Sequence, residues 1–187
     1  MTVIGTVGLP GSGKGEAAAV AEEAGVPVFV MGDVIRQACR DRGLDPEEHH
    51  GEVARALREE DGPAAIAERS LPRLREHLED SDTVLVDGLR SDVEVERFRE
   101  AFGDDFVLVS IEAPFDARAE RLGARGRDES DLDREALRAR EERELSFGMG
   151  EAMGMADVVV ENTGSLAAFR SKVRRLLSEG PAALEEP

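Results

Sequence analysis

The chain has 187 residues and a formal net charge of -17, with 24 lysine and arginine residues against 41 aspartate and glutamate residues. This length favours one domain with a core large enough to need no disulfide or metal staples, and the single cysteine excludes a disulfide framework and a cysteine-based zinc site. The acidity argues against nucleic acids and anionic membranes as partners, because the average surface would repel phosphate. Since there is no apolar run of ~20 residues and no signal-peptide pattern, we expect a cytoplasmic protein.

Five short apolar runs predict the strands of a buried parallel sheet. They are β-branched or continuously apolar, as strands covered on both faces should be. Their residue ranges are 3–8, 27–30, 83–86, 106–111 and 158–160. Helical patterns alternate with these runs, so we expect an α/β fold in which helices flank a five-stranded parallel sheet.

Local signals mark the ends of several helices. Ser91 opens a capping-box pattern, Pro114 can begin a helix, and Ser165 can cap the last one. The Gly- and Met-rich residues 146–155 are expected to be irregular, and residues 179–187 are expected to form a flexible tail.

Two segments are longer than a simple crossover requires. Residues 31–82 look wholly helical, with Pro72 marking a kink or a restart, and they predict a helical insert that would bind an acceptor. Residues 123–133 are charged, contain glycine and have no apolar stripe, so we expect a short mobile lid. The single domain would then span residues 1–178, with its core in residues 1–30, 83–122 and 134–178.

The strongest functional signal is Gly8-Leu9-Pro10-Gly11-Ser12-Gly13-Lys14, which follows a predicted strand and precedes a predicted helix. Glycines let successive backbone N–H groups turn around a phosphate, and the helix N-terminus adds positive potential. The lysine reaches the outer phosphates of a nucleotide. We therefore predict an ATP site made by Gly8, Pro10, Gly11, Ser12, Gly13, Lys14, Gly15 and Glu16.

Gly15 stands where such loops usually carry the serine or threonine that ligates magnesium. We therefore expect Mg²⁺ to be held by the nucleotide phosphates and by water, with carboxylates behind them. Asp87 ends the third predicted strand, where a carboxylate can order magnesium-bound water; alternatively, it only starts a turn.

Two arginines follow predicted strands at the edge where open α/β sheets bind ligands. Arg36 and Arg90 can bind phosphate in a bidentate manner, and together they predict an acceptor that itself carries phosphate. Alternatively, each is a surface ion-pair partner. Asp33 has three open roles: it orders magnesium-bound water, it accepts a hydroxyl proton, or it only caps a helix over residues 34–42.

Arginines also cluster around the predicted lid. Arg121 and Arg125 are four residues apart and can share a helix face, so we expect them to neutralise the transferred phosphoryl group when the lid closes. The wider cluster comprises Arg118, Arg127, Arg140 and Arg143. The last two could instead be solvated charges among neighbouring glutamates.

These motifs, in this order, resemble those of adenylate kinases. The similarity lies in the glycine after the P-loop lysine, in Gly32-Asp33-x-x-Arg36, in Asp87-Gly88-x-Arg90 and in Arg121-x-x-x-Arg125. Glu16 departs from the pattern, because that family usually has threonine there. The segment containing Asn162, Thr163 and Gly164 instead resembles the adenine-binding end of dephospho-coenzyme A kinases. That resemblance implies that Asn162 and Gly164 meet the base of ATP; alternatively, they only form a turn.

As a whole, residues 2–178 resemble an archaeal family of adenylate-kinase-like P-loop proteins, which implies a P-loop NTPase fold. We expect an ATP- and Mg²⁺-dependent phosphotransferase of the nucleoside-monophosphate-kinase type, acting on a small phosphate-bearing acceptor as a monomer or dimer. A hydroxyl kinase similar to dephospho-coenzyme A kinase is one alternative, in which Asp33 would be the base. A nucleotide-binding regulatory module with little turnover is the other.

Only Lys14 and Lys172 are lysines. Chains that are rich in Asp, Glu, Ala and Arg and nearly free of lysine resemble proteins of salt-loving archaea, although a GC-rich genome gives the same bias. The charge concerns solubility and not the fold.

Overall fold

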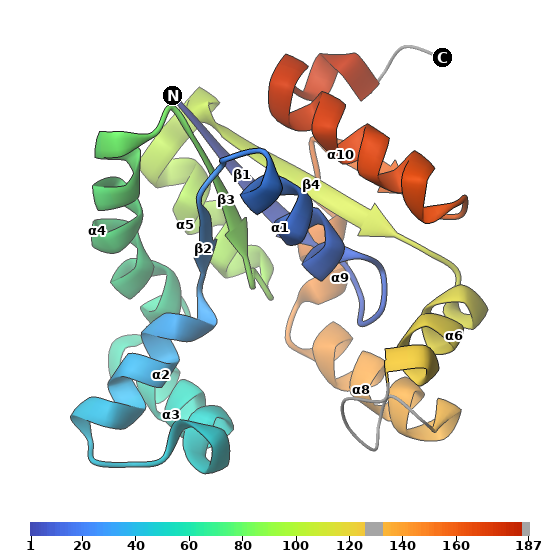
Figure 1. The fold of residues 1–187 in the computed structure, drawn as a ribbon. Helices are drawn as coiled ribbons and strands as arrows, with labels where there is room; N and C mark the ends of the chain where they lie inside the picture. Colours follow the sequence, from blue (N-terminus) through green and yellow to red (C-terminus); the bar gives the residue numbers. More distant parts are fainter. Residues whose placement is uncertain (126–132, 185–187) are drawn as a thin grey trace.

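The computed structural model describes residues 1–125 and 133–184 (Figure 1). Its centre is a parallel five-stranded sheet with the strand order β2-β3-β1-β4-β5, which confirms the predicted fold class. The strands are β1 (Thr2–Val7), β2 (Val28–Val30), β3 (Thr83–Asp87), β4 (Phe106–Glu112) and β5 (Val158–Glu161). Because β1 lies directly between β3 and β4, the loop after β1 and Asp87 at the end of β3 share one edge of the sheet.

Helices cover both faces of the sheet, and the side chains of β1 alternate between them. Val3 and Val7 belong to the larger apolar cluster, whereas Ile4 belongs to the smaller one. The smaller cluster packs against α1 (Lys14–Glu23) and α10 (Leu166–Glu179). The larger one contains buried residues of α2 (Gly32–Asp41), α3 (Pro46–Asp61), α4 (Ala65–Asp80), α5 (Asp92–Phe102) and α9 (Met149–Gly154).

Three helices, α2, α3 and α4, fill the segment expected to be a helical insert. The expected restart at Pro72 is wrong, because α4 runs through this residue. Pro72 is exposed, while Leu71 and Leu74 beside it are fully buried, so packing of the apolar stripe holds the helix together despite the missing N–H. Asp33 does not cap α2, since the helix begins at Gly32, two residues before the expected start, with Met31 as N-cap.

The expected helix starts are present. Ser91 accepts a hydrogen bond from the Glu94 N–H at the start of α5, and Ser165 accepts one from the Ala168 N–H at the start of α10. The helix α6 (Phe115–Arg125) directly follows Pro114.

Three expectations about irregular segments are wrong in part. Residues 123–125 are the last turn of α6 and not the start of a loop, while residues 126–132 of the expected lid lie outside the described residues. Residues 149–154 form α9, because Met149 and Ala152 bury one helical face. Within the expected tail, Pro181–Leu184 is the short 3-10 helix η2, and Leu184 packs on the smaller apolar cluster.

The remaining helical elements are α8 (Arg134–Ser146) and the 3-10 helix η1 (Gly103–Asp105). Figure 1 shows α2 and α3 on one side of the loop that follows β1, and α6 and α8 on the other. Among the described residues, no helix has the length and apolar character that a membrane crossing requires.

Candidate functional site

The loop between β1 and α1 has a backbone that only glycine can form at key points. Gly13 has a φ of 123°, and a Cβ there would lie 2.5 Å from Nδ2 of Asn162. A larger residue would therefore strain the backbone and displace a buried amide at once. The loop lines a pocket together with Asp87, Leu122 and Arg140. This arrangement is what phosphate binding requires: a glycine-rich turn at a helix N-terminus, with cations beside it.

Lys14 begins α1 and folds back over this loop. Its Nζ donates hydrogen bonds to the carbonyl oxygens of Gly8 and Leu9. Burial lowers the pKa of Lys14 from 10.5 to about 8, although the carboxylates of Glu144 and Asp87 oppose the shift. A partly desolvated ammonium group is stabilised by an incoming anion, so the site favours phosphate electrostatically.

Asn162 braces the loop from the end of β5. Its Nδ2 donates to the Ser12 carbonyl oxygen at 2.8 Å, and its backbone carbonyl oxygen accepts from Arg121 Nη2 at 2.7 Å. The sequence predicted that Asn162 contacts the base of ATP, and it did not predict that this side chain supports the P-loop. Among the described residues, Ser12 Oγ and Arg121 Nη1 are buried without a hydrogen-bond partner, which leaves donors next to the loop for a ligand.

Arg118 braces the same loop from α6. Its side chain is 3% exposed, and its guanidinium donates to the carbonyl oxygens of Pro10 at 3.1 Å and Ala113 at 3.0 Å. Glu141 on α8 pairs with it at 2.6 Å. Arg118 is thus a structural tie between the loop, α6 and α8, and not one of the lid arginines. The Arg125 side chain and Arg127 lie outside what the structure describes.

Glu16 turns away from the loop. Its carboxylate pairs with Arg170 on α10, so its contribution to the expected nucleotide site is limited to its backbone. Gly164 is exposed just before α10 begins.

A second group of charges lies at the carboxyl edge of β2 and β3. Arg36 pairs with Asp33 at 2.6 Å, and Arg58 pairs at 3.1 Å with Glu94, which is 1% exposed. Arg90 forms an ion pair with Glu144 of α8 at 3.8 Å. Arg58 was not among the residues predicted for the site. A signal was available, because Arg58 lies on the apolar side of an amphipathic helix, one position after the buried Leu57.

Glu144 lies between the P-loop pocket and the group of charges at the carboxyl ends of β2 and β3. It is 12% exposed, and the same Oε1 atom lies 3.8 Å from Arg90 Nη1 and 3.5 Å from Arg140 Nε. Arg140 also lines the P-loop pocket, whereas Arg143 is exposed. Glu144 was expected only as one of the glutamates around Arg140 and Arg143, although its i,i+4 spacing from Arg140 was a usable signal.

The positions of Asp87 and Asp33 fit a Mg²⁺ ion that is held mainly by nucleotide phosphates and water. Among residues 1–125 and 133–184, no three His, Cys, Asp or Glu side chains form a metal-binding group. Asp87 lines the P-loop pocket, and Asp33 is half-exposed beside Arg36. Mg²⁺ commonly keeps several waters and binds through one or two carboxylates plus nucleotide phosphates, so Asp87 is the residue best placed to order its water shell.

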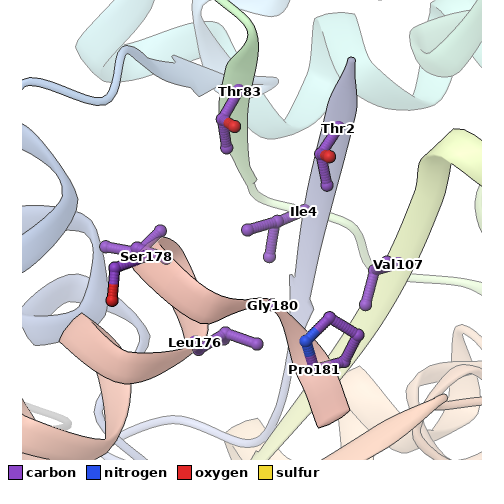
Figure 2. A pocket seen from close by; sticks show the side chains of 9 residues that line it. Thr2, Ile4, Thr83, Val107, Leu176, Ser178, Gly180 and Pro181 are labelled. Atoms are coloured by element: carbon purple, nitrogen blue, oxygen red, sulfur yellow. The ribbon is translucent and has the colours of Figure 1, made fainter. Parts of the chain in front are cut away.

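Another pocket lies at the opposite edge of the sheet (Figure 2). It is lined by Thr2, Ile4, Thr83, Val107, Leu176, Leu177, Ser178, Gly180 and Pro181. Thr2 and Thr83 are the first residues of their strands. Open α/β sheets bind ligands at the carboxyl ends of their strands, so this pocket is not the candidate site.

Comparison with known proteins supports the parallel α/β fold and the P-loop described above. A family model described as an AAA domain matches residues 7–138, and together with the parallel sheet this defines the class as a P-loop NTPase. The chain is 60% identical over 187 residues to a UPF0200 protein of Halobacterium salinarum, covering 100% of this chain and 98% of that protein. It is 47% identical over 179 residues to a UPF0200 protein of Methanosarcina mazei, covering 95% of each. The chain therefore belongs to the UPF0200 family, and the Halobacterium relative agrees with the salt-loving composition.

Three solved structures share the fold. The first is TT1252 from Thermus thermophilus, with a TM-score of 0.65 and 23% identity over 95% of this chain and 97% of that one. A gluconokinase from Sinorhizobium meliloti has a TM-score of 0.57 and 19% identity over 98% and 95%. Shikimate kinase from Acinetobacter baumannii has a TM-score of 0.54 and 19% identity over 96% and 94%. At these identities the likeness concerns the fold alone.

Proposed function

We propose that the protein is an ATP·Mg-dependent phosphotransferase of the nucleoside-monophosphate-kinase type, acting in the cytoplasm as a monomer or dimer. It would move the γ-phosphoryl group of ATP to a small acceptor that carries phosphate. The observation that carries the proposal is the position of Glu144, whose one carboxylate contacts both Arg90 and Arg140. Since Arg140 lines the P-loop pocket, a donor phosphate at the loop and an acceptor phosphate at Arg90 would lie within transfer reach.

Each residue has a physical role in this proposal. Lys14 and the P-loop amides hold the outer phosphates of ATP, while Arg121 and Arg140 offset the negative charge that spreads over the transferred group. Arg36 and Arg90 hold the acceptor. Bound Mg²⁺ would neutralise charge on the phosphates. An acceptor phosphate oxygen needs positioning and charge neutralisation but no strong base.

One placement favours a second candidate, a hydroxyl kinase similar to dephospho-coenzyme A kinase. Asp33 is free of the capping role and sits beside Arg36, where it could accept the proton of an acceptor hydroxyl. The kinases among the fold neighbours, by their names, are also kinases of small molecules. For a hydroxyl acceptor, Asp33→Asn should nearly abolish transfer, whereas for a phosphate acceptor it should slow transfer much less.

The test is ADP formation from ATP·Mg in concentrated potassium chloride, with and without AMP, CMP, UMP, GMP and dephospho-coenzyme A. We expect one acceptor to stimulate turnover strongly. Arg36→Met and Arg90→Met should raise the KM of that acceptor at least tenfold with little effect on the KM of ATP. Arg55→Met is the matched control, since Arg55 is exposed on α3. Turnover that is undetectable or independent of every acceptor would contradict the proposal and favour a regulatory nucleotide-binding module.

A further inference from the structure

One of two adjacent histidines faces the proposed acceptor site. A Cβ built at Gly32 would lie 3.3 Å from Nη1 of Arg36 and 3.5 Å from Nε2 of His50. The guanidinium of α2 and the imidazole of α3 therefore converge on the same point, and the missing side chain of Gly32 leaves room between them. From the sequence alone, His49 and His50 are both expected to be surface residues. His49 fits that description, since its Nδ1 only meets the Asp45 carbonyl oxygen of its own helix start at 3.2 Å.

The charges that most affect the protonation of His50 are those of three arginines. Burial, followed by Arg36, Arg90 and Arg58, lowers the pKa of His50 below 6.5, and a hydrogen bond with the Gly32 backbone opposes this only in part. The nearby carboxylates each belong to an arginine: Asp33 to Arg36, Glu94 to Arg58, and Glu144 to Arg90. In the protein alone, burial and these arginines therefore favour the neutral imidazole.

We propose that His50 is a specificity-determining residue of the acceptor site, where it donates a hydrogen bond to the acceptor's phosphate and takes up one proton from solvent as that phosphate binds. The proposal rests on the proposed function and deepens it, because it restricts the acceptor to phosphate monoesters. A monoester dianion brings two negative charges and three free oxygens, which matches Arg36, Arg90 and an imidazolium. A carboxylate or a phosphodiester has fewer charges and fewer free oxygens. On release of the acceptor the proton returns to solvent.

Proton uptake has a direct readout that a structural histidine would not give. The chain has three histidines, so their imidazole NMR signals can be assigned with single His→Gln variants. The probes are AMP and inorganic phosphate, added to the protein without ATP. We expect saturation with either probe to raise the pKa of His50 by about one unit or more, while the signals of His49 and His77 stay unchanged. Arg36→Met should remove the shift.

Kinetics give the second readout. His50→Gln should raise the KM of the best acceptor roughly tenfold at pH 6.5. This difference should shrink as the pH rises and the acceptor-bound imidazole loses its proton. The KM of ATP should not change. His49→Gln is the matched control and should alter neither constant.

The two proposals fail in different ways. If no acceptor is phosphorylated but inorganic phosphate still shifts His50, the kinase assignment is wrong and the phosphate site is correct. If an acceptor is phosphorylated but the pKa of His50 does not move when AMP or phosphate saturates the site, His50 is not an acceptor ligand. If neither AMP nor inorganic phosphate changes the NMR signal of His50 at any concentration, the His50 proposal is overturned, whether or not an acceptor is phosphorylated.

Discussion

The pKa of Lys14 gives a prediction that can be worked out in free energy. Below pH 8 the lysine is charged in both the folded and the unfolded chain. Between pH 8 and 10.5 the unfolded chain binds a proton that the folded chain has released, because burial lowers the pKa of Lys14 to about 8. The contribution of Lys14 to the free energy of unfolding must therefore rise with pH across this window. Each pH unit contributes about 1.4 kcal/mol, so Lys14 adds about 2 to 3 kcal/mol between pH 8 and pH 10.

Lys14→Met isolates this contribution. Urea unfolding of the wild type and the variant, measured at pH 7.5 and at pH 10, gives two stability differences. From pH 7.5 to pH 10, the stability of the wild type relative to the variant should increase by about 2 to 3 kcal/mol. The hydrogen bonds to Gly8 and Leu9 that the variant lacks do not affect this change, since they are missing at both pH values. Lys172→Met is the control, because this only other lysine is exposed on α10. A pH-independent difference between wild type and Lys14→Met would refute the reasoning.

Three further outcomes are expected. Gly13→Ala should lower the free energy of unfolding by more than about 2 kcal/mol and abolish nucleotide binding. Gly15→Ala should leave thermal stability intact, because a Cβ there meets no atom within 4 Å. Equal losses of stability in calorimetry would contradict this. Arg118→Ala should lower the free energy of unfolding in urea by about 3 kcal/mol or more, since it breaks a buried ion pair, whereas Arg143→Ala should change it little, because Arg143 is exposed on α8. Lowering potassium chloride from about 2 M to 0.1 M should lower the Tm, because a net charge of -17 is then less screened; an unchanged Tm would argue against salt dependence.

The sequence predicted the strands and the P-loop well because each depends on local information. The strands are short apolar runs between helical patterns, and the loop is a contiguous motif whose geometry its own glycines dictate. The start of α2 was missed for a local reason too. Gly32 is a poor helix former, so Asp33 was the more plausible cap, yet the helix begins two residues earlier than expected, and Val34 and Ile35 of its first turn are buried.

The rest of the site depends on which helix faces approach one another. His50 and Glu144 look like ordinary members of charged helices, and only the packing of α3 against α2 and the position of α8 bring them to Arg36 and Arg90. Asn162 is similar, because nothing in its local pattern shows that its amide meets Ser12. Such pairings are set by tertiary structure, which no periodicity in the chain encodes.

The hydrogen bond from Asn162 to the Ser12 carbonyl oxygen spans 150 positions of the chain. During synthesis, the segment that carries the phosphate loop leaves the ribosome long before β5 exists. Contacts of such separation form late, because their loop-closure entropy must first be offset. The nascent chain would thus hold a complete P-loop sequence without its final shape, and competence to bind a nucleotide would arrive only when the last strand docks.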